Sequence, residues 1–317
     1  MRFRRYAWAV LGFNLLVVLW GAFVRATGSG AGCGAHWPLC NGEVIPRTAA
    51  AATMIEFAHR VSSGLALILV VGLYWALRGS LPRRHYARRA ALASVVFVVI
   101  EALIGAGLVL LELVGENDSM IRAGYLAAHL LNTFLLLGAL ALTAWWAMDP
   151  VPWQRLTGPP VRGLLGVATA AVLVVGMTGA VAALGDTLFP SRSLAEGLRA
   201  DVAGDAHLLV RLRVLHPVLA IFTGVYLSTM VWRVGRKRPA ALDAPWGRLV
   251  SSLVLVQLSL GMANLLLLAP VPLQLLHLLV ADLLWIALVL FGAGALTVRA
   301  HPVSQGEEAD LEPQPGS

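Results

Sequence analysis

Eight long apolar runs dominate this sequence and constrain its fold more than any other feature. A helix needs about 20 mostly apolar residues to cross the hydrocarbon core of a bilayer. Only 13% of the residues are charged, whereas soluble domains carry about 25%. We therefore expect an all-α integral membrane protein with eight transmembrane helices. The runs cover residues 7–25, 55–77, 90–112, 123–147, 163–184, 208–232, 248–269 and 273–298.

The distribution of basic residues predicts how these helices are oriented. The chain has 24 Lys and Arg residues and 17 Asp and Glu residues, a balance that could suggest nucleic-acid binding. Most of the basic residues, however, lie at the N-terminus, after the second run, in the central linker and after the sixth run. Short cytoplasmic loops have this excess. We expect both termini in the cytoplasm of a multi-pass protein of the bacterial inner membrane, surrounded by lipid, with no nucleic-acid partner.

Short matches between the two ends of the chain suggest an internal repeat. Four motifs recur in the same order and at nearly constant spacing: Gly21-Ala22 with Gly179-Ala180, His59-Arg60-Val61 with His216-Pro217-Val218, Glu101 with Gln257, and His129-Leu130-Leu131 with His277-Leu278-Leu279. We therefore predict two pseudo-symmetric four-helix bundles, as in parallel repeats. The predicted divisions are an N-terminal half at 1–147, a Pro- and Gly-rich cytoplasmic linker at 148–162, a C-terminal half at 163–300 and a disordered acidic tail at 301–317.

Four histidines fall inside the apolar runs, two in each predicted half: His59, His129, His216 and His277. With the N-terminus inside, all four lie in the outer third of the membrane, about four to nine residues after their helices begin. Ionisable residues in a membrane usually have a function. Two facing imidazoles suit haem iron, because zinc needs about four clustered ligands. Two axial histidines also favour electron transfer. The alternative is that these histidines only hydrogen-bond neighbouring helices.

Several arginines lie near the outer helix ends, against the general charge distribution: Arg25, Arg60, Arg122, Arg211 and Arg213. A guanidinium group pairs well with a carboxylate, so these residues could contact haem propionates. Long basic side chains also reach toward the membrane surface without any ligand, and the sequence leaves both explanations open.

Glu56 precedes His59 by three residues, which places both side chains on one helix face. A carboxylate there could accept or pass on a proton, or it could form an ion pair with Arg60. Glu101 lies inside the third run, where we expect a hydrogen bond between helices. Cys33 and Cys40 both lie in the first outer loop, an oxidising location where a disulfide is reasonable, although two unpaired thiols are the alternative.

The outer loop and its neighbours resemble the haem A synthase family. The resemblance rests on Gly21-Ala22-Phe23-Val24-Arg25-Ala26-Thr27-Gly28-Ser29-Gly30, Cys33, Trp37-Pro38-Leu39-Cys40-Asn41-Gly42 and Glu56-Phe57-Ala58-His59-Arg60. It extends over the whole chain through the eight runs and four histidines. The family oxidises a methyl group of haem O to a formyl group by successive hydroxylations, which gives haem A for terminal oxidase assembly.

The resemblance implies a role for each motif residue. His216 and His277 would bind a resident haem b, and His59 and His129 would hold the substrate haem O. Glu56 would be the catalytic carboxylate. Cys33 and Cys40 would be the paired cysteines of a bacterial type with one such pair, because the loop at about 185–207 has none.

The implied partners are the synthase that supplies haem O and the assembly factors of terminal oxidases, with an unidentified electron acceptor. Two other functions remain open at this point: a di-haem membrane cytochrome that only transfers electrons, and a haem-carrying transport module. Glu56 and the outer-loop motif favour the enzyme, since an electron carrier needs no carboxylate beside its ligand.

Overall fold

The computed structural model describes residues 2–47, 50–147, 153–155, 159–237 and 245–299. Within these ranges, eight helical spans have the length and composition to cross a membrane, which confirms the predicted number. Seven are single helices, and α7 together with α8 forms the sixth. The bounds are α1 Arg2–Ala26, α2 Ala51–Ser80, α3 Tyr86–Leu110, α4 Met120–Trp146, α5 Pro159–Leu188, α7 Leu208–Leu212, α8 Leu215–Lys237, α10 Pro245–Leu266 and α11 Val271–Leu296.

The sixth span differs from the sequence prediction because it is broken. The apolar run at 208–232 contains the short α7 and the start of α8, which begins at Leu215. His216 is therefore the second residue of its helix, whereas we predicted at least about four residues before each histidine. Pro217 gives the reason. A proline has no N–H to donate to the carbonyl four residues earlier, so it is tolerated only in the first turn of a helix.

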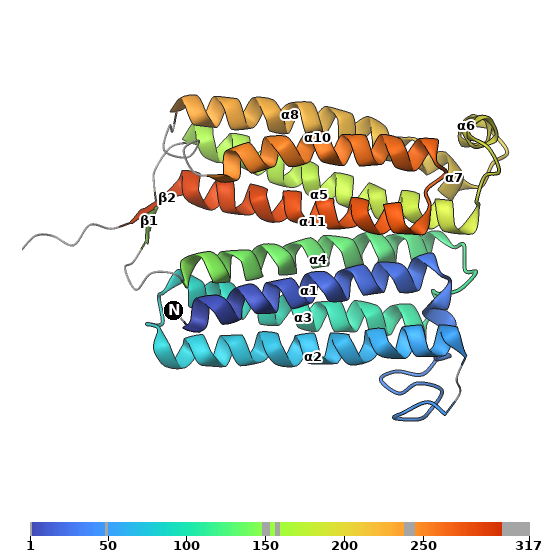
Figure 1. Ribbon diagram of the computed structural model, residues 1–317, viewed down its shortest axis with the longest axis horizontal. Helices are drawn as coiled ribbons and strands as arrows, with labels where there is room; N and C mark the ends of the chain where they lie inside the picture. Colours follow the sequence, from blue (N-terminus) through green and yellow to red (C-terminus); the bar gives the residue numbers. More distant parts are fainter. Residues whose placement is uncertain (1, 48–49, 148–152, 156–158, 238–244, 300–317) are drawn as a thin grey trace, which may run out of the picture.

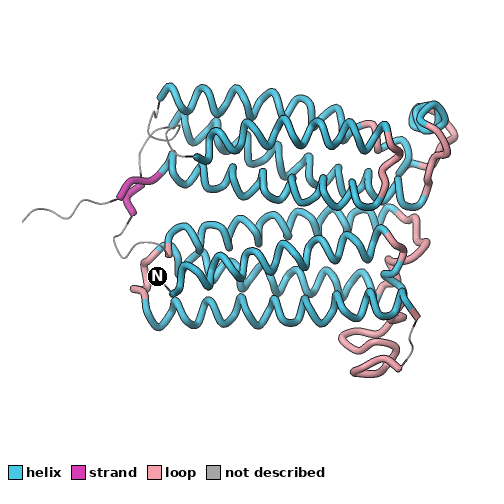
Figure 2. Tube along the Cα trace, viewed as in Figure 1, coloured by secondary structure: helices cyan, strands magenta, loops and turns pink. Residues whose placement is uncertain are grey.

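The spans form two groups of four (Figure 1). Helices α1, α2, α3 and α4 lie together, and α5, α8, α10 and α11 lie together beside them (Figure 2). We call these the N-terminal and C-terminal halves. The start of α1 and the end of α11 lie at the same end of the molecule (Figure 1), as an even number of spans requires.

The two halves pack through α4, which is the most deeply buried of the eight spans. The ring of Phe134 on α4 stacks on Trp285 of α11, with 5.6 Å between ring centroids, and Trp285 Nε1 donates a hydrogen bond to the Phe134 carbonyl. A Cβ at Gly176 on α5 would lie only 2.8 Å from the Phe134 ring. Small residues allow such close approach between helices in a membrane.

Short elements cover both ends of the bundles. At one end lie the 3-10 helix η1 Ser29–Ala31, the long loop before α2, and α6 Leu194–Val202 (Figure 1). At the other end, β1 Trp153–Arg155 pairs antiparallel with β2 Thr297–Arg299, so part of the predicted linker contacts the end of the C-terminal half. The rest of the linker before α5, and the predicted acidic tail at 301–317, lie outside the described residues.

Candidate haem sites

In the C-terminal half, α8 and α11 bring His216 and His277 together. Their ring centroids lie 6.4 Å apart and their planes are nearly perpendicular, at 88°. Two metal–nitrogen bonds of about 2 Å, with half an imidazole ring at each end, span roughly 6 Å. The separation of these rings therefore fits one metal ion bound between them.

The surroundings of His216 leave one ring nitrogen available for a metal. Its Nδ1 lies 3.2 Å from the Val175 carbonyl, which can only accept, so Nδ1 carries the proton and Nε2 remains free. Metal-bound histidines usually donate their other N–H in this way. A Cβ at Gly179 would lie 2.9 Å from His216 Cε1, so a glycine is needed at this position of α5.

His277 is held differently. Its Nε2 lies 3.2 Å from the side-chain nitrogen of Gln257 on α10, and its Nδ1 is buried without a hydrogen-bond partner among the described residues. A buried polar atom without a partner is uncommon in proteins and calls for an explanation. A ligand that reorients the ring or takes the place of the glutamine amide would provide one.

In the N-terminal half, α2 carries His59 and α4 carries His129. A Cβ at Gly21 of α1 would lie 2.9 Å from His59 Cε1, the same close packing that Gly179 makes with His216. The Nδ1 atoms of both histidines are buried without a hydrogen bond among the described residues. Glu101 of α3 is nearby, with Oε1 3.4 Å from His129 Nδ1.

Glu56 is buried and both of its carboxylate oxygens have partners. Oε1 pairs with Arg60 at 2.5 Å, and Oε2 accepts a hydrogen bond of 2.8 Å from the Cys33 backbone N–H. The ion pair suggested as the alternative role for this residue is thus present. Arg60 also donates to the carbonyls of His36 and Leu39, so one carboxylate–guanidinium pair connects α2 to the outer loop.

The two cysteines of the chain form the disulfide that their location suggested. Cys33 and Cys40 are bonded to each other, and Asn41 N–H donates to the Cys33 carbonyl beside the bond. Thr53 Oγ1 donates to the Gly32 carbonyl at 2.8 Å. The disulfide therefore closes a loop that lies directly over the start of α2 and over Glu56.

The predicted propionate-binding arginines have diverse environments. Arg25 crosses between the halves and donates to the Ala183 carbonyl, Thr187 Oγ1 and Gln274 Oε1. Arg213 pairs with Asp186 and Asp201. Arg211, in contrast, is exposed. Arg122, also noted in the sequence, is buried and donates to the Gly115 and Asn117 carbonyls. Contact with a propionate remains a prediction for all of them.

Sequence reasoning missed the partner of His129. Glu101 was expected to bond between helices, and it does so, because Asn132 and Thr133 of α4 both donate to it. Its proximity to a histidine was not foreseen, although the matching of Glu101 with Gln257 could have indicated it. Asp282 of α11 is fully buried with neither oxygen hydrogen-bonded among the described residues.

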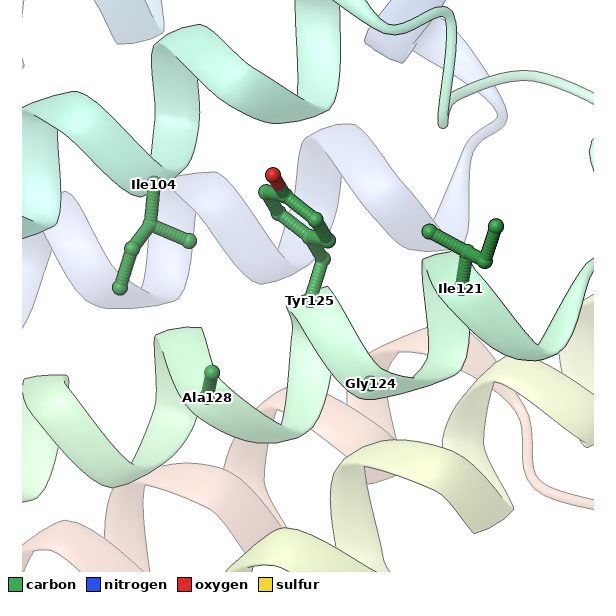
Figure 3. A pocket seen from close by; sticks show the side chains of 5 residues that line it. All are labelled: Ile104, Ile121, Gly124, Tyr125 and Ala128. Atoms are coloured by element: carbon green, nitrogen blue, oxygen red, sulfur yellow. The ribbon is translucent and has the colours of Figure 1, made fainter.

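A shallow apolar groove lies between α3 and α4, near the N-terminal histidines. Ile104, Ile121, Gly124, Tyr125 and Ala128 line it, and the Tyr125 ring points toward α3 (Figure 3). Ala128 immediately precedes His129. The groove contains no charged side chain and no histidine, so it is not itself a metal site.

The donor set fits haem better than a metal ion held by protein alone. Within the described ranges, no group of three or more His, Cys, Asp or Glu residues could hold a metal ion. Each half instead offers two imidazoles, which matches the two axial positions of a haem iron. The packing of Gly21 and Gly179 against the histidines leaves these rings room that a larger side chain would fill.

Comparison with known proteins finds relatives whose names refer to haem. A protein of Thermus thermophilus named protoheme IX farnesyltransferase is 48% identical over 308 residues, which are 96% of this chain and 50% of that protein. Proteins named heme A synthase match a smaller part: 42% identity over 129 residues in Alkalihalophilus pseudofirmus, and 38% over 130 residues in Halalkalibacterium halodurans, about two fifths of either chain in both cases. The chain spans half the length of its Thermus relative.

A family model covers nearly the whole chain. The model described as cytochrome oxidase assembly protein, COX15-CtaA, matches residues 4–289, a range that includes the disulfide loop, the four histidines and most or all of each of the eight spans. This chain therefore belongs to the COX15-CtaA family of cytochrome oxidase assembly proteins, the family of the haem A synthases.

Proposed function

We propose that this chain oxidises a methyl group of haem O to a formyl group by two successive hydroxylations, and so provides haem A for terminal oxidase assembly. The observation that carries the proposal is the placement of Glu56 one helical turn from His59, beneath the disulfide loop. Family membership supports the same reaction. The Thermus relative is about twice as long as the matched region, so its activity does not carry over directly to this chain.

We further infer that the two halves are repeats of one four-helix unit, with both termini on the cytoplasmic side of a bacterial inner membrane. Matching contacts support the repeat. Gly21 packs on His59 as Gly179 packs on His216, and the matched residues Glu101 and Gln257 each lie beside the second histidine of their half. The charge distribution supports the orientation.

The two halves would then bind different haems. His216 and His277 would hold haem b, which supplies electron transfer when bound. His59 and His129 would hold the substrate haem O. Arg25, Arg60, Arg211 and Arg213 are the proposed propionate contacts, through guanidinium–carboxylate pairing.

Glu56 is the proposed proton acceptor. Two electrons from the methyl C–H bond would pass through haem b to the unidentified electron acceptor, the oxidised carbon would bind water, and a positioned carboxylate can take up the protons that are released. Arg60 binds the same carboxylate and the outer loop, so it holds the Glu56 carboxylate in place. After the second hydroxylation, the gem-diol loses water and leaves the formyl group.

The partners follow from this chemistry. A farnesylating synthase must supply haem O, and the Thermus relative, which is about twice as long as the matched region, is named for protoheme farnesylation. We propose that such a synthase and the assembly factors of terminal oxidases work with this chain.

A di-haem cytochrome that only transfers electrons is the second candidate, and the matched histidine pairs favour it. A haem-carrying transport module is a third. Neither of these two functions requires a proton acceptor at Glu56. Only the enzyme would convert added haem O into another haem.

Pigment extraction tests the proposal. The purified protein is supplied with haem O under oxidising conditions, and its extracted haems are identified by mass. We expect haem b together with haem A or a hydroxylated haem O. If haem O is recovered unchanged after conditions that support turnover in a heme A synthase such as that of Alkalihalophilus pseudofirmus, the enzyme assignment is wrong.

A further inference from the structure

Glu101 connects α3 to one turn of α4 and faces a proposed haem ligand. Its Oε2 accepts a hydrogen bond of 2.5 Å from Asn132 Nδ2, and its Oε1 accepts one from Thr133 Oγ1. The same Oε1 lies 3.4 Å from His129 Nδ1. Donors therefore surround both oxygens of a partly buried side chain.

The donors around Glu101 determine how the His129 ring is presented. A carboxylate that already accepts two hydrogen bonds has lone pairs left for a third donor, and Nδ1 of His129 faces it at 3.4 Å without another hydrogen-bond partner among the described residues. With its proton on Nδ1, the ring has Nε2 free. Carboxylates orient metal-bound histidines in this way and raise the basicity of the coordinating nitrogen.

The corresponding position in the C-terminal half lacks the charge. Gln257 matches Glu101 in the proposed repeat, and its side-chain nitrogen lies 3.2 Å from Nε2 of His277. Nδ1 of His277 has no hydrogen-bond partner among the described residues, and the same is true of Nδ1 of His129, which differs in facing a carboxylate oxygen at 3.4 Å. The amide thus approaches the opposite ring nitrogen from the one that Glu101 approaches, and it brings no negative charge.

We infer that Glu101 is the positioning residue of the N-terminal site, holding His129 with Nδ1–H toward its carboxylate and Nε2 toward the iron of the substrate haem. The inference rests on the proposed function, which places haem O in that half. Added ligand basicity stabilises ferric over ferrous iron. The Glu101–Gln257 difference therefore makes the N-terminal iron the harder of the two to reduce.

Exchange of the two residues tests this assignment in the full-length protein in detergent, loaded with haem b and haem O. Glu101→Gln should raise the midpoint potential of the N-terminal haem and shift its low-spin EPR signal, without changing haem b. Gln257→Glu should lower the potential of haem b. Glu101→Ala should weaken binding of added haem O by about 10–100-fold, the usual effect of removing such a partner.

Two further variants separate positioning from helix packing and from the site assignment itself. Thr133→Val removes a helix contact of Glu101 but leaves the carboxylate beside His129, so it should change the potential and EPR signal far less than Glu101→Gln. His129→Ala should abolish the N-terminal signal; if it does not, the proposed function has failed at this site. If His129→Ala removes the signal but Glu101→Gln leaves affinity, potential and EPR unchanged, or changes them no more than Thr133→Val, Glu101 is not the positioning residue.

Discussion

The two halves resemble each other in how a glycine packs against the first histidine, and they differ in the polar groups around their histidines. In each half, a glycine on the first helix packs against the first histidine. Three residues before that histidine stands Glu56 in one half and Arg213 in the other. Beside the second histidine lies Glu101 in one half and Gln257 in the other. Under the proposed division of roles, Glu56 and Glu101 would lie in the half that needs a proton acceptor, whereas Arg213 in the other half is paired with Asp186 and Asp201.

This contrast supports the proposed division between a reacting half and an electron-transferring half. A carboxylate in a membrane is costly unless it is paired, and both Glu56 and Glu101 have partners; we propose that their position near the histidines of one half serves the reaction. The shared glycine–histidine packing, in contrast, is required for any ring to fit between these helices. We therefore attribute the shared glycine–histidine packing to the fold, and the different polar residues near the histidines to the proposed difference in chemistry.

The largest expected effect comes from the histidines themselves. His216→Ala or His277→Ala should abolish the low-spin haem b spectrum, because one axial ligand of the pair is lost. His59→Ala or His129→Ala should instead remove the substrate haem and leave haem b in place. Absorption spectra and haem content by mass measure both outcomes. A variant of the C-terminal pair with full haem b and an unchanged spectrum would contradict the division.

Glu56→Gln should affect turnover alone. The amide keeps the shape of the side chain but cannot accept a proton, and general base catalysis contributes about 10²–10⁴-fold to rate. We expect haem A formation to fall by about that factor, with haem O or a hydroxylated intermediate accumulating while both haems stay bound.

Glu43→Gln is the matched control for that experiment. Glu43 also pairs with an arginine four residues later, Arg47, but on the exposed surface of the same loop, where such a pair contributes little to stability. Its loss should leave haem A formation unchanged. Normal turnover in Glu56→Gln, or an equal loss in Glu43→Gln, would show that Glu56 has no catalytic role.

The sequence predicted the architecture well because lipid permits few structures. The eight spans follow from apolar length alone, and the Cys33–Cys40 bond followed from location and proximity. Contacts between helices distant in the sequence could not be predicted. Arg25 binding to α5 and α11 depends on how the halves dock. The break before His216 could have been predicted from Pro217, because a proline is not tolerated deep in a helix. The prediction missed it because it used only the length of the apolar run.

The disulfide should matter to the N-terminal half and not to the other. Closing a loop of this length stabilises a folded protein by roughly 2–3 kcal/mol in the chain-entropy description. The double variant Cys33→Ser, Cys40→Ser should lower the melting temperature and reduce haem A formation, because Cys33 N–H holds Glu56. The haem b spectrum should stay the same. If haem b is lost together with activity, the loop supports the whole molecule and the contrast between the halves weakens.

The smallest effect concerns whether the halves unfold as one unit. Trp285→Phe keeps an aromatic ring to stack on Phe134 but removes the hydrogen bond from Nε1 to the Phe134 carbonyl. Loss of one such bond costs about 0.5–1.5 kcal/mol. Since this contact joins α11 to α4, the loss should lower the melting temperature slightly. The decrease should be the same whether unfolding is followed by haem b absorption or by proteolysis of the N-terminal half.

Phe189→Leu serves as the comparison variant. It removes an aromatic contact with His207 within the C-terminal outer region, so it should shift the transition seen by haem b absorption more than the one seen by proteolysis. If Trp285→Phe moves only one of the two probes, the halves unfold independently and their interface does not couple them.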